Sequence, residues 1–342
     1  MYSFDDIIGE ERIKSKMKSV AQSGMHSHAY LIVGEKRSGK TTLANCFVKA
    51  LQCEGEGVKP CGKCLSCLQI DAGAHPDVIY VQHEKPSGYG VDDIRKGVTD
   101  DIVFKPYRSD KKIYVIDDAQ KMNIAAQNAL LKTLEEPPSY GIIIMISTSS
   151  EVMIPTILSR TVLLPIRPVR NELIKKYLMN KKELPDYRAD VIVAFARGNF
   201  GRAIDLISNE DFDKKKEEAV EILKNIKGDD YGVLYKRATE FGKEKKEKKE
   251  NKEDGNSHFE ELLDFFLVWY RDALIYKTTD RVQDLIFREE IQYIKKVSKE
   301  IAYEDFERIF EAIRKSGEMI RSNVNIETAA DLLLITIKQC YQ

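Results

Sequence analysis

The sequence predicts an α/β domain with a parallel five-stranded sheet flanked by helices, followed by a small helical domain and an all-helical C-terminal domain. Three observations support this division. Short runs rich in Val, Ile and Leu alternate with helical patterns up to about residue 165. A phosphate-loop motif follows the first of these runs. From Pro165 onward the strand pattern disappears and only helical patterns remain.

The predicted strands are nearly continuous in aliphatic residues, which is typical of strands buried on both faces of a parallel sheet. We therefore assign residues 1–165 to the α/β domain, 166–208 to the small helical domain and 209–342 to the C-terminal domain. The five predicted strands are Ala29–Val33, Val78–Val81, Ile113–Ile116, Ile142–Ile146 and Val162–Leu164.

The second half of the chain shows helical periodicity. The small domain contains helical patterns at Asn171–Met179, Arg188–Ala196 and Arg202–Ser208, with a turn predicted at 198–201. In the C-terminal domain an apolar stripe predicts a packed helix, on which Trp269 reads as a packing residue. The stripe consists of Leu262, Leu263, Phe266, Leu267 and Tyr270. Residues 243–257 are almost entirely charged or polar, so we predict a solvated helix extension or a disordered loop there.

Composition excludes several classes of protein. A chain of 342 residues with 43% hydrophobic and 32% charged residues is typical of a globular protein of two or three domains. The net charge of −1 excludes a general polyanion binder, so any contact with DNA must be local or shared with partners. No apolar run approaches the ~20 residues of a membrane span. The N-terminus resembles no signal peptide, so we expect a cytoplasmic protein with no membrane contact.

The stretch Gly34–Thr41 satisfies the pattern GxxxxGK[ST] and lies between a predicted strand and a predicted helix. That context turns backbone N–H groups and a helix N-terminus toward a phosphate. Lys40 is expected to reach the β- and γ-phosphates, and the Thr41 hydroxyl to hold Mg²⁺. The motif indicates a phosphate cradle, but it does not show that hydrolysis occurs.

Polar residues that complete a nucleotide site follow two other strands. Asp117 and Asp118 come directly after the strand 113–116, in the pattern of an acid that binds Mg²⁺. Asp118 stands where hydrolytic enzymes of this layout carry Glu; being one methylene shorter, it is a doubtful catalytic acid, and capping of the next helix is its alternative role. Ser147 and Thr148 follow the strand 142–146 and could orient water or the γ-phosphate. The residues predicted to bind ATP and Mg²⁺ are Gly34, Gly39, Lys40, Thr41, Thr42, Asp117 and Thr148.

Four of the six cysteines lie within fifteen residues, and the last three form a Cys-x2-Cys-x2-Cys pattern. Four soft thiolate ligands favour tetrahedral Zn²⁺ in a closed, structural site. An iron–sulfur cluster is the alternative metal group, and disulfides are not expected in a cytosolic chain. The predicted zinc ligands are Cys53, Cys61, Cys64 and Cys67, in a module spanning 53–67.

Together these residues resemble the AAA+ clamp-loader subunits of bacterial DNA polymerase III over nearly the whole chain. The cysteine module after the first helix of the nucleotide-binding domain is a trait of that family. Four further segments carry the resemblance: Phe4–Gly9, His28–Leu31, Asn128–Pro138 and Thr156–Thr161. The resemblance implies an AAA+ domain with bound ATP–Mg²⁺ and structural Zn²⁺, a helical lid at 166–208 and a C-terminal collar for oligomerisation.

Arg160 is the functional residue that the resemblance singles out. In the family, the arginine of this motif points out of its own subunit at the γ-phosphate bound by a neighbour. An arginine supplied in trans stabilises the charge that develops in phosphoryl transfer and contributes about 10³–10⁵ in rate. The alternative interpretation of Arg160 is a surface salt bridge.

The resemblance implies one of two branches: the δ′ subunit, a stator, or the γ/τ subunit, an ATPase motor. Three features favour δ′: a length suited to three domains, Asp118 in place of Glu, and the segment 198–203. In that segment Gly201 stands where the motor carries an arginine that senses nucleotide, and Arg202 lies one residue later, about 100° around the helix. The intact phosphate loop argues against δ′.

The δ′ branch implies a specific set of partners. Five subunits sit in an arc that opens the ring-shaped sliding clamp (β) and places it on primer–template DNA. This chain would contact the γ/τ and δ subunits and would hydrolyse ATP weakly or not at all. Membership would make it part of the polymerase holoenzyme without polymerase activity of its own. The alternatives are a γ/τ-type motor and, less favoured, a P-loop kinase, for which we find no basic lid.

Overall fold

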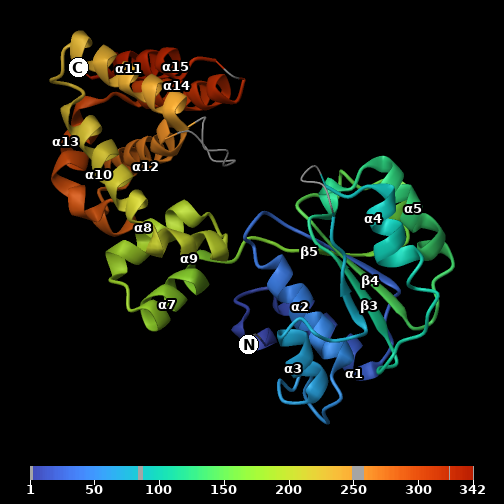
Figure 1. The fold of residues 1–342 in the computed structure, drawn as a ribbon. Coiled ribbons are helices and arrows are strands. Elements are labelled where there is room, and N and C mark those ends of the chain that lie inside the picture. Colours follow the sequence, from blue (N-terminus) through green and yellow to red (C-terminus); the bar gives the residue numbers. More distant parts are fainter. Residues whose placement is uncertain (1–2, 84–87, 249–257, 323, 342) are drawn as a thin grey trace. The chain divides into compact units, whose positions relative to one another are not determined.

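The computed structural model describes residues 3–83, 88–248, 258–322 and 324–341. The chain divides into two compact units (Figure 1). Unit 1 contains residues 1–176 and 196–204, and unit 2 contains residues 177–195 and 205–342. The residues of the predicted lid, 166–208, are therefore shared between the two units.

Unit 1 is built on a five-stranded parallel sheet, which confirms the predicted sheet. The strand order is β2-β3-β4-β1-β5, and every neighbouring pair is parallel. Each strand agrees with its predicted limits to within one residue at either end. The strands are β1 (Ala29–Val33), β2 (Val78–Tyr80), β3 (Lys112–Ile116), β4 (Gly141–Ser147) and β5 (Val162–Pro165).

Helices cover both faces of the sheet because successive strand side chains point to opposite faces. On β1, Tyr30 and Ile32 belong to one buried cluster, whereas Ala29 and Leu31 belong to the other. Figure 1 shows α1, α2 and α3 on one side and α4 and α5 on the other. These helices are α1 (Glu11–Ser23), α2 (Lys40–Gln52), α3 (Leu65–Asp71), α4 (Val91–Ile94), continued by a π-helical turn (Arg95–Thr99), and α5 (Ile124–Glu135); the short α6 (Pro155–Leu158) precedes β5.

The register brings three functional segments to one edge of the sheet. Val33 pairs with Ser147, and Ile116 pairs with Met145. Because β4 lies between β1 and β3, the phosphate loop after β1, the acidic pair after β3 and the polar turn after β4 are neighbours. Ligands of open parallel sheets bind at this carboxyl edge.

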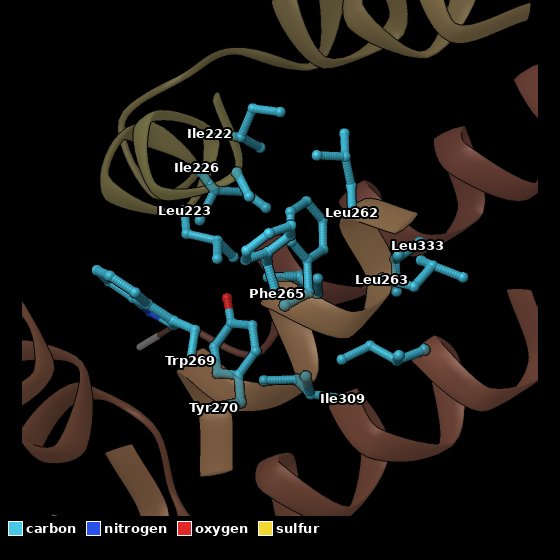
Figure 2. Close-up of a cluster of buried hydrophobic side chains, with 14 of the residues drawn as sticks. Ile222, Leu223, Ile226, Leu262, Leu263, Phe265, Trp269, Tyr270, Ile309 and Leu333 are labelled. Carbon is cyan, nitrogen blue, oxygen red and sulfur yellow. The ribbon is translucent and has the colours of Figure 1, made fainter. Parts of the chain in front are cut away.

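Unit 2 is all-helical and packs around α12 (His258–Thr279) (Figure 2). Trp269 and Tyr270 are wholly buried there beside Leu223 and Ile309. Leu267, which we included in the apolar stripe, is 37% exposed because the buried face of the helix runs through Phe265 and Trp269 instead. The other helices are α8 (Asp186–Ala196), α10 (Glu210–Asn225), α11 (Tyr231–Lys248), α13 (Ile291–Glu300), α14 (Tyr303–Arg321) and α15 (Ile326–Gln339).

Two helices, α7 (Asn171–Lys182) and α9 (Phe200–Ser208), divide their residues between the units. Helix α9 begins earlier than predicted because Asn199 caps it: Asn199 Oδ1 accepts a hydrogen bond from the Arg202 N–H at 3.1 Å. The predicted charged segment 243–257 extends α11 to Lys248, and its remainder lies outside the described residues. Within the described ranges, no helix has the length and apolarity to cross a membrane.

Candidate nucleotide site and trans arginine

The phosphate loop connects β1 to α2 and has the backbone that a phosphate cradle requires. Gly39, directly before α2, has φ = +86°, a left-handed conformation that favours glycine. Gly34 lies against Ile166 and Ser38, where an added Cβ would come within 3.1 Å and 3.0 Å of side-chain atoms. The two motif glycines therefore serve different purposes: Gly39 allows the turn, and Gly34 allows the loop to pack closely.

Lys40 is 8% exposed and lies along the inner side of the loop. Its Nζ donates hydrogen bonds to the carbonyl oxygens of Gly34 at 2.8 Å and Glu35 at 2.5 Å. Burial lowers the pKa of the Lys40 ammonium, and the carboxylates of Asp117 and Asp118 oppose that shift. A nucleotide phosphate would supply further opposite charge at this position and stabilise the ammonium form.

Two residues predicted to hold Mg²⁺ meet across the sheet edge. The Thr41 hydroxyl donates to Asp117 Oδ2 at 3.3 Å, although 76 residues separate them. Asp117 Oδ1 accepts from the Asp118 N–H at 2.8 Å, and the hydroxyl of Tyr89 donates to the Asp117 carbonyl at 2.7 Å. Thr42 follows directly on α2. The donor set, one hydroxyl and one carboxylate oxygen, fits an Mg²⁺ ion bound with ATP phosphates.

Asp118 has a strained backbone conformation, and its side chain does not cap the next helix. Its φ of +49° is unusual for a residue other than glycine, and its side chain makes no capping hydrogen bond. Asp118 Oδ2 lies 2.8 Å from Lys121 Nζ, and Oδ1 accepts from Gln120 Nε2 at 2.8 Å. The hydrogen bond from Lys121 lowers the pKa of the Asp118 carboxyl. A carboxylate so engaged is a weak base toward an attacking water.

The residues that follow β4 differ in their availability. The hydroxyl of Ser147 is buried and donates to the Ser149 carbonyl at 2.7 Å, so it is committed to its own turn. Thr148 is partly exposed, and its N–H donates to Gln120 Oε1 at 3.1 Å. Gln120 therefore joins the turn after β4 to Asp118 after β3.

Arg160 follows α6 and is paired within its own chain. Its Nη2 lies 3.1 Å from Glu135 Oε1 at the end of α5, and its Nη1 donates to the Thr156 carbonyl at 3.2 Å. The side chain is 36% exposed. Arg160 therefore forms the salt bridge of the alternative interpretation. It also has the exposure that a contact with another subunit would require.

The four clustered cysteines converge as predicted from their spacing. Their sulfur atoms all lie within 4.8 Å of one another, compared with roughly 3.8 Å for sulfurs around a tetrahedral zinc at 2.3 Å. The N–H groups of Cys61, Cys64 and Cys67 donate to the sulfurs of Cys53, Cys61 and Cys64, respectively, at 3.3–3.5 Å. Gly55 permits this, since a Cβ there would lie 2.7 Å from Cys61 Sγ. The donor set fits a structural Zn²⁺, which would tie the loop 53–67 to the start of α3.

A polar network joins the cysteine module to the sheet. Glu54 accepts from the Ser66 hydroxyl at 2.9 Å and from the Arg108 guanidinium at 3.1 Å. The Ser66 hydroxyl lies 3.2 Å from His75 Nε2, and His75 Nδ1 accepts from the Asp77 N–H at 3.2 Å. Asp77 precedes β2, so the network connects the module to the first residues of that strand.

Subunits of bacterial DNA polymerase III are similar to this chain. The family described as "DNA polymerase III, delta subunit" matches residues 9–170. DNA polymerase III subunit delta′ from Bacillus subtilis is 26% identical over 334 residues, which cover 96% of each chain. The chain is therefore similar to the clamp-loader subunits of bacterial DNA polymerase III.

Some of the similar proteins are longer than this chain. The tau subunit from Bacillus subtilis is 28% identical over 93% of this chain and 58% of its own length. The gamma/tau subunit from Mycobacterium tuberculosis is 35% identical over 48% of this chain and 28% of its own length. A solved gamma-subunit-related protein from Thermotoga maritima aligns over 96% of this chain and 99% of that chain at 17% identity, with a TM-score of 0.44. At that TM-score the structural alignment adds nothing to the resemblance.

Sequence reasoning missed contacts made by several residues that shape this site. Tyr89 and Gln120 support the acidic pair, and Glu135 holds Arg160. Asn199 and Gly201 contact the phosphate loop from the start of α9. Glu135 carried a signal because it lies in the segment 128–138 that resembles the family, and Gly201 did because it stands where the motor branch carries an arginine. The others depend on contacts between distant segments.

Proposed function

We propose that this chain is a δ′-type subunit of the clamp loader, a stator that helps place the sliding clamp on primed DNA in the cytoplasm. The alignment with delta′ over 96% of both chains supports this branch. The partners follow from it: γ/τ and δ subunits, the β clamp, and primer–template DNA through the assembled complex. The collar formed by residues 209–342 would hold the neighbours, and residues 166–208 would serve as the lid.

The observation that carries the stator proposal is the state of Asp118. Its carboxylate is short, strained at φ = +49° and engaged by Lys121 and Gln120. Efficient hydrolysis needs a group within reach of the attacking water. Gly201, at the position of the motor's sensing arginine, has no side chain to offer the nucleotide. Both differences argue for a chain that hydrolyses ATP weakly or not at all.

Arg160 is the residue through which a stator would affect catalysis. Its guanidinium is partly exposed. In this proposal it would turn to a neighbouring subunit's nucleotide once Glu135 releases it. In the neighbour's site it would stabilise the charge on the transferring phosphoryl group. Arg160 is thus proposed to act in trans, while Lys40 acts in the chain's own site.

The chain's own cofactors in this proposal are structural Zn²⁺ and ATP–Mg²⁺. Cys53, Cys61, Cys64 and Cys67 would close the zinc coordination shell without an open position for catalysis. When bound, Mg²⁺ would neutralise phosphate charge between Thr41 and Asp117. The role of ATP in this site is to be bound rather than consumed.

One observation favours the second candidate, a γ/τ-type motor: the phosphate-loop motif is intact, and its Thr41 hydroxyl lies 3.3 Å from Asp117 Oδ2. Steady-state ATP turnover by the purified chain alone, beside a Lys40→Ala variant, separates the two candidates. A stator shows no turnover above the variant and no self-assembly by analytical ultracentrifugation. Turnover that is lost in Lys40→Ala would establish the motor and overturn the stator proposal.

A further inference from the structure

Four consecutive carbonyl groups of the phosphate loop accept hydrogen bonds. Lys40 Nζ donates hydrogen bonds to the carbonyl oxygens of Gly34 and Glu35. The next two carbonyl groups bond to the start of α9. Asn199 Nδ2 donates to the Lys36 carbonyl at 2.8 Å, and the Gly201 N–H donates to the Arg37 carbonyl at 3.1 Å. Successive backbone N–H groups of a turn can form a concave anion site, so contacts that fix the backbone of this loop also fix that site.

Arg37 shows why this support matters. Its φ of +64° lies in the left-handed region, which costs roughly a factor of ten in population for a residue with a side chain. Such conformations persist when the surroundings hold them. The Gly201 N–H bonds to the carbonyl of Arg37 itself, so α9 stabilises the strained residue at the crest of the loop.

Gly201 and Asn199 are suited to this contact by size and chemistry. A Cβ at residue 201 would lie 2.1 Å from the Arg37 oxygen, so only glycine allows this approach. Asn199 is 8% exposed and uses both ends of its amide: Oδ1 caps α9 at Arg202, and Nδ2 holds Lys36. No other side chain of this length combines an acceptor for the cap with a donor for the loop.

We propose that Asn199 and Gly201 are positioning residues that hold the phosphate loop in its anion-binding form, so that the start of α9 sets the affinity for a nucleoside di- or triphosphate. Gly201 thus replaces the sensing arginine of the motor branch with a backbone contact to the loop instead of a side-chain contact to the nucleotide. The inference rests on the nucleotide-binding part of the proposed function, not on the stator role.

Binding of Mg²⁺–ADP and Mg²⁺–ATP to the full chain, measured by isothermal titration calorimetry, tests this inference. The Gly201→Ala variant must move α9 off the loop, and we expect a dissociation constant raised about tenfold or more. Asn199→Ser keeps a hydroxyl cap for α9 but cannot reach Lys36, and we expect a rise of about three- to tenfold. Gly228→Ala is the matched control, since its Cβ would meet only Asn225 O at 3.6 Å, and it should bind as the unchanged chain does.

The outcomes separate this inference from the stator proposal. Weaker binding in both variants, with an unchanged Gly228→Ala control and circular dichroism spectra that match, supports the inference. Equal or tighter binding in Asn199→Ser and Gly201→Ala would overturn it, because the loop would then not need α9. Absence of binding by the unchanged chain at millimolar nucleotide would overturn it as well, while leaving a stator that acts through Arg160 untouched.

Discussion

Arg160 Nη2 lies 3.1 Å from Glu135 Oε1, so the arginine proposed to act on a neighbour is held by a carboxylate of its own subunit. Both side chains are partly exposed, and an exposed ion pair of this kind contributes about 0.2–1 kcal/mol. A triphosphate carries several negative charges, so its attraction for the guanidinium would offset the small free energy lost when this ion pair breaks. Glu135 would then hold the Arg160 side chain in place until a neighbouring subunit with bound nucleotide takes it over.

This relationship predicts that Glu135→Gln weakens the hold on Arg160. In a complex reconstituted with γ/τ and δ subunits from the same organism, we expect ATP turnover to rise by up to about fivefold at the neighbour's site, the equivalent of the lost pair. Glu136→Gln is the control, since Glu136 is exposed and lies one residue away. A turnover that falls in Glu135→Gln would show instead that the carboxylate positions Arg160 for catalysis.

The cysteine cluster predicts a stoichiometric metal. Freshly reduced protein should contain about one zinc per chain by elemental analysis, and Cys64→Ser should lose it, because the closed shell needs all four ligands. Metal binding is coupled to folding of such a module, so the thermal midpoint of the variant should fall as well. Cys46→Ala is the control: Cys46 is buried outside the cluster and should leave the metal content unchanged. Finding no zinc in the unchanged chain would refute the metal assignment.

Asp77 predicts a pH-dependent contribution to stability. Its carboxylate, 1% exposed, accepts hydrogen bonds from the N–H groups of Tyr107, Arg108 and Ser109 and from the Ser109 hydroxyl. Burial alone would raise the pKa of Asp77, but these hydrogen bonds together lower it. A lowered pKa in the folded state means that this stabilisation is present above the usual carboxyl range and is lost as the pH falls through the folded pKa.

The corresponding measurement is urea unfolding of the unchanged chain and Asp77→Asn. At pH 7 we expect the variant to be less stable by about 2 kcal/mol, because the amide cannot accept from all four donors. The difference should shrink below pH of about 4, where the unchanged carboxyl becomes protonated in the unfolded state. Asp110→Asn, in the same loop, is the control. A difference that stays constant down to pH 3 would contradict the assignment to the ionised carboxylate.

The sheet and the phosphate loop could be predicted because local sequence determines them. Continuous aliphatic runs mark the five strands, and the motif 34–41 marks the loop. The contacts that distinguish this site could not be predicted, since they join residues far apart: Asn199 and Lys36 are separated by 163 residues. The pattern at 198–201 suggested a turn, whereas the capping amide of Asn199 starts the helix at Phe200. The local sequence pattern can indicate a helix cap, but it cannot show which distant loop the capping side chain also contacts.

The central claim is that this chain acts through Arg160 on a neighbour rather than through its own nucleotide site. The most direct test is ATP turnover of the reconstituted complex containing the unchanged chain, Arg160→Ala or Lys40→Ala, with assembly checked by size-exclusion chromatography. We predict that Arg160→Ala removes the part of the complex's ATP turnover that comes from the neighbouring site, since an arginine supplied in trans contributes about 10³–10⁵ in rate. We predict that Lys40→Ala leaves the turnover unchanged. Turnover that falls in Lys40→Ala but not in Arg160→Ala would contradict the account.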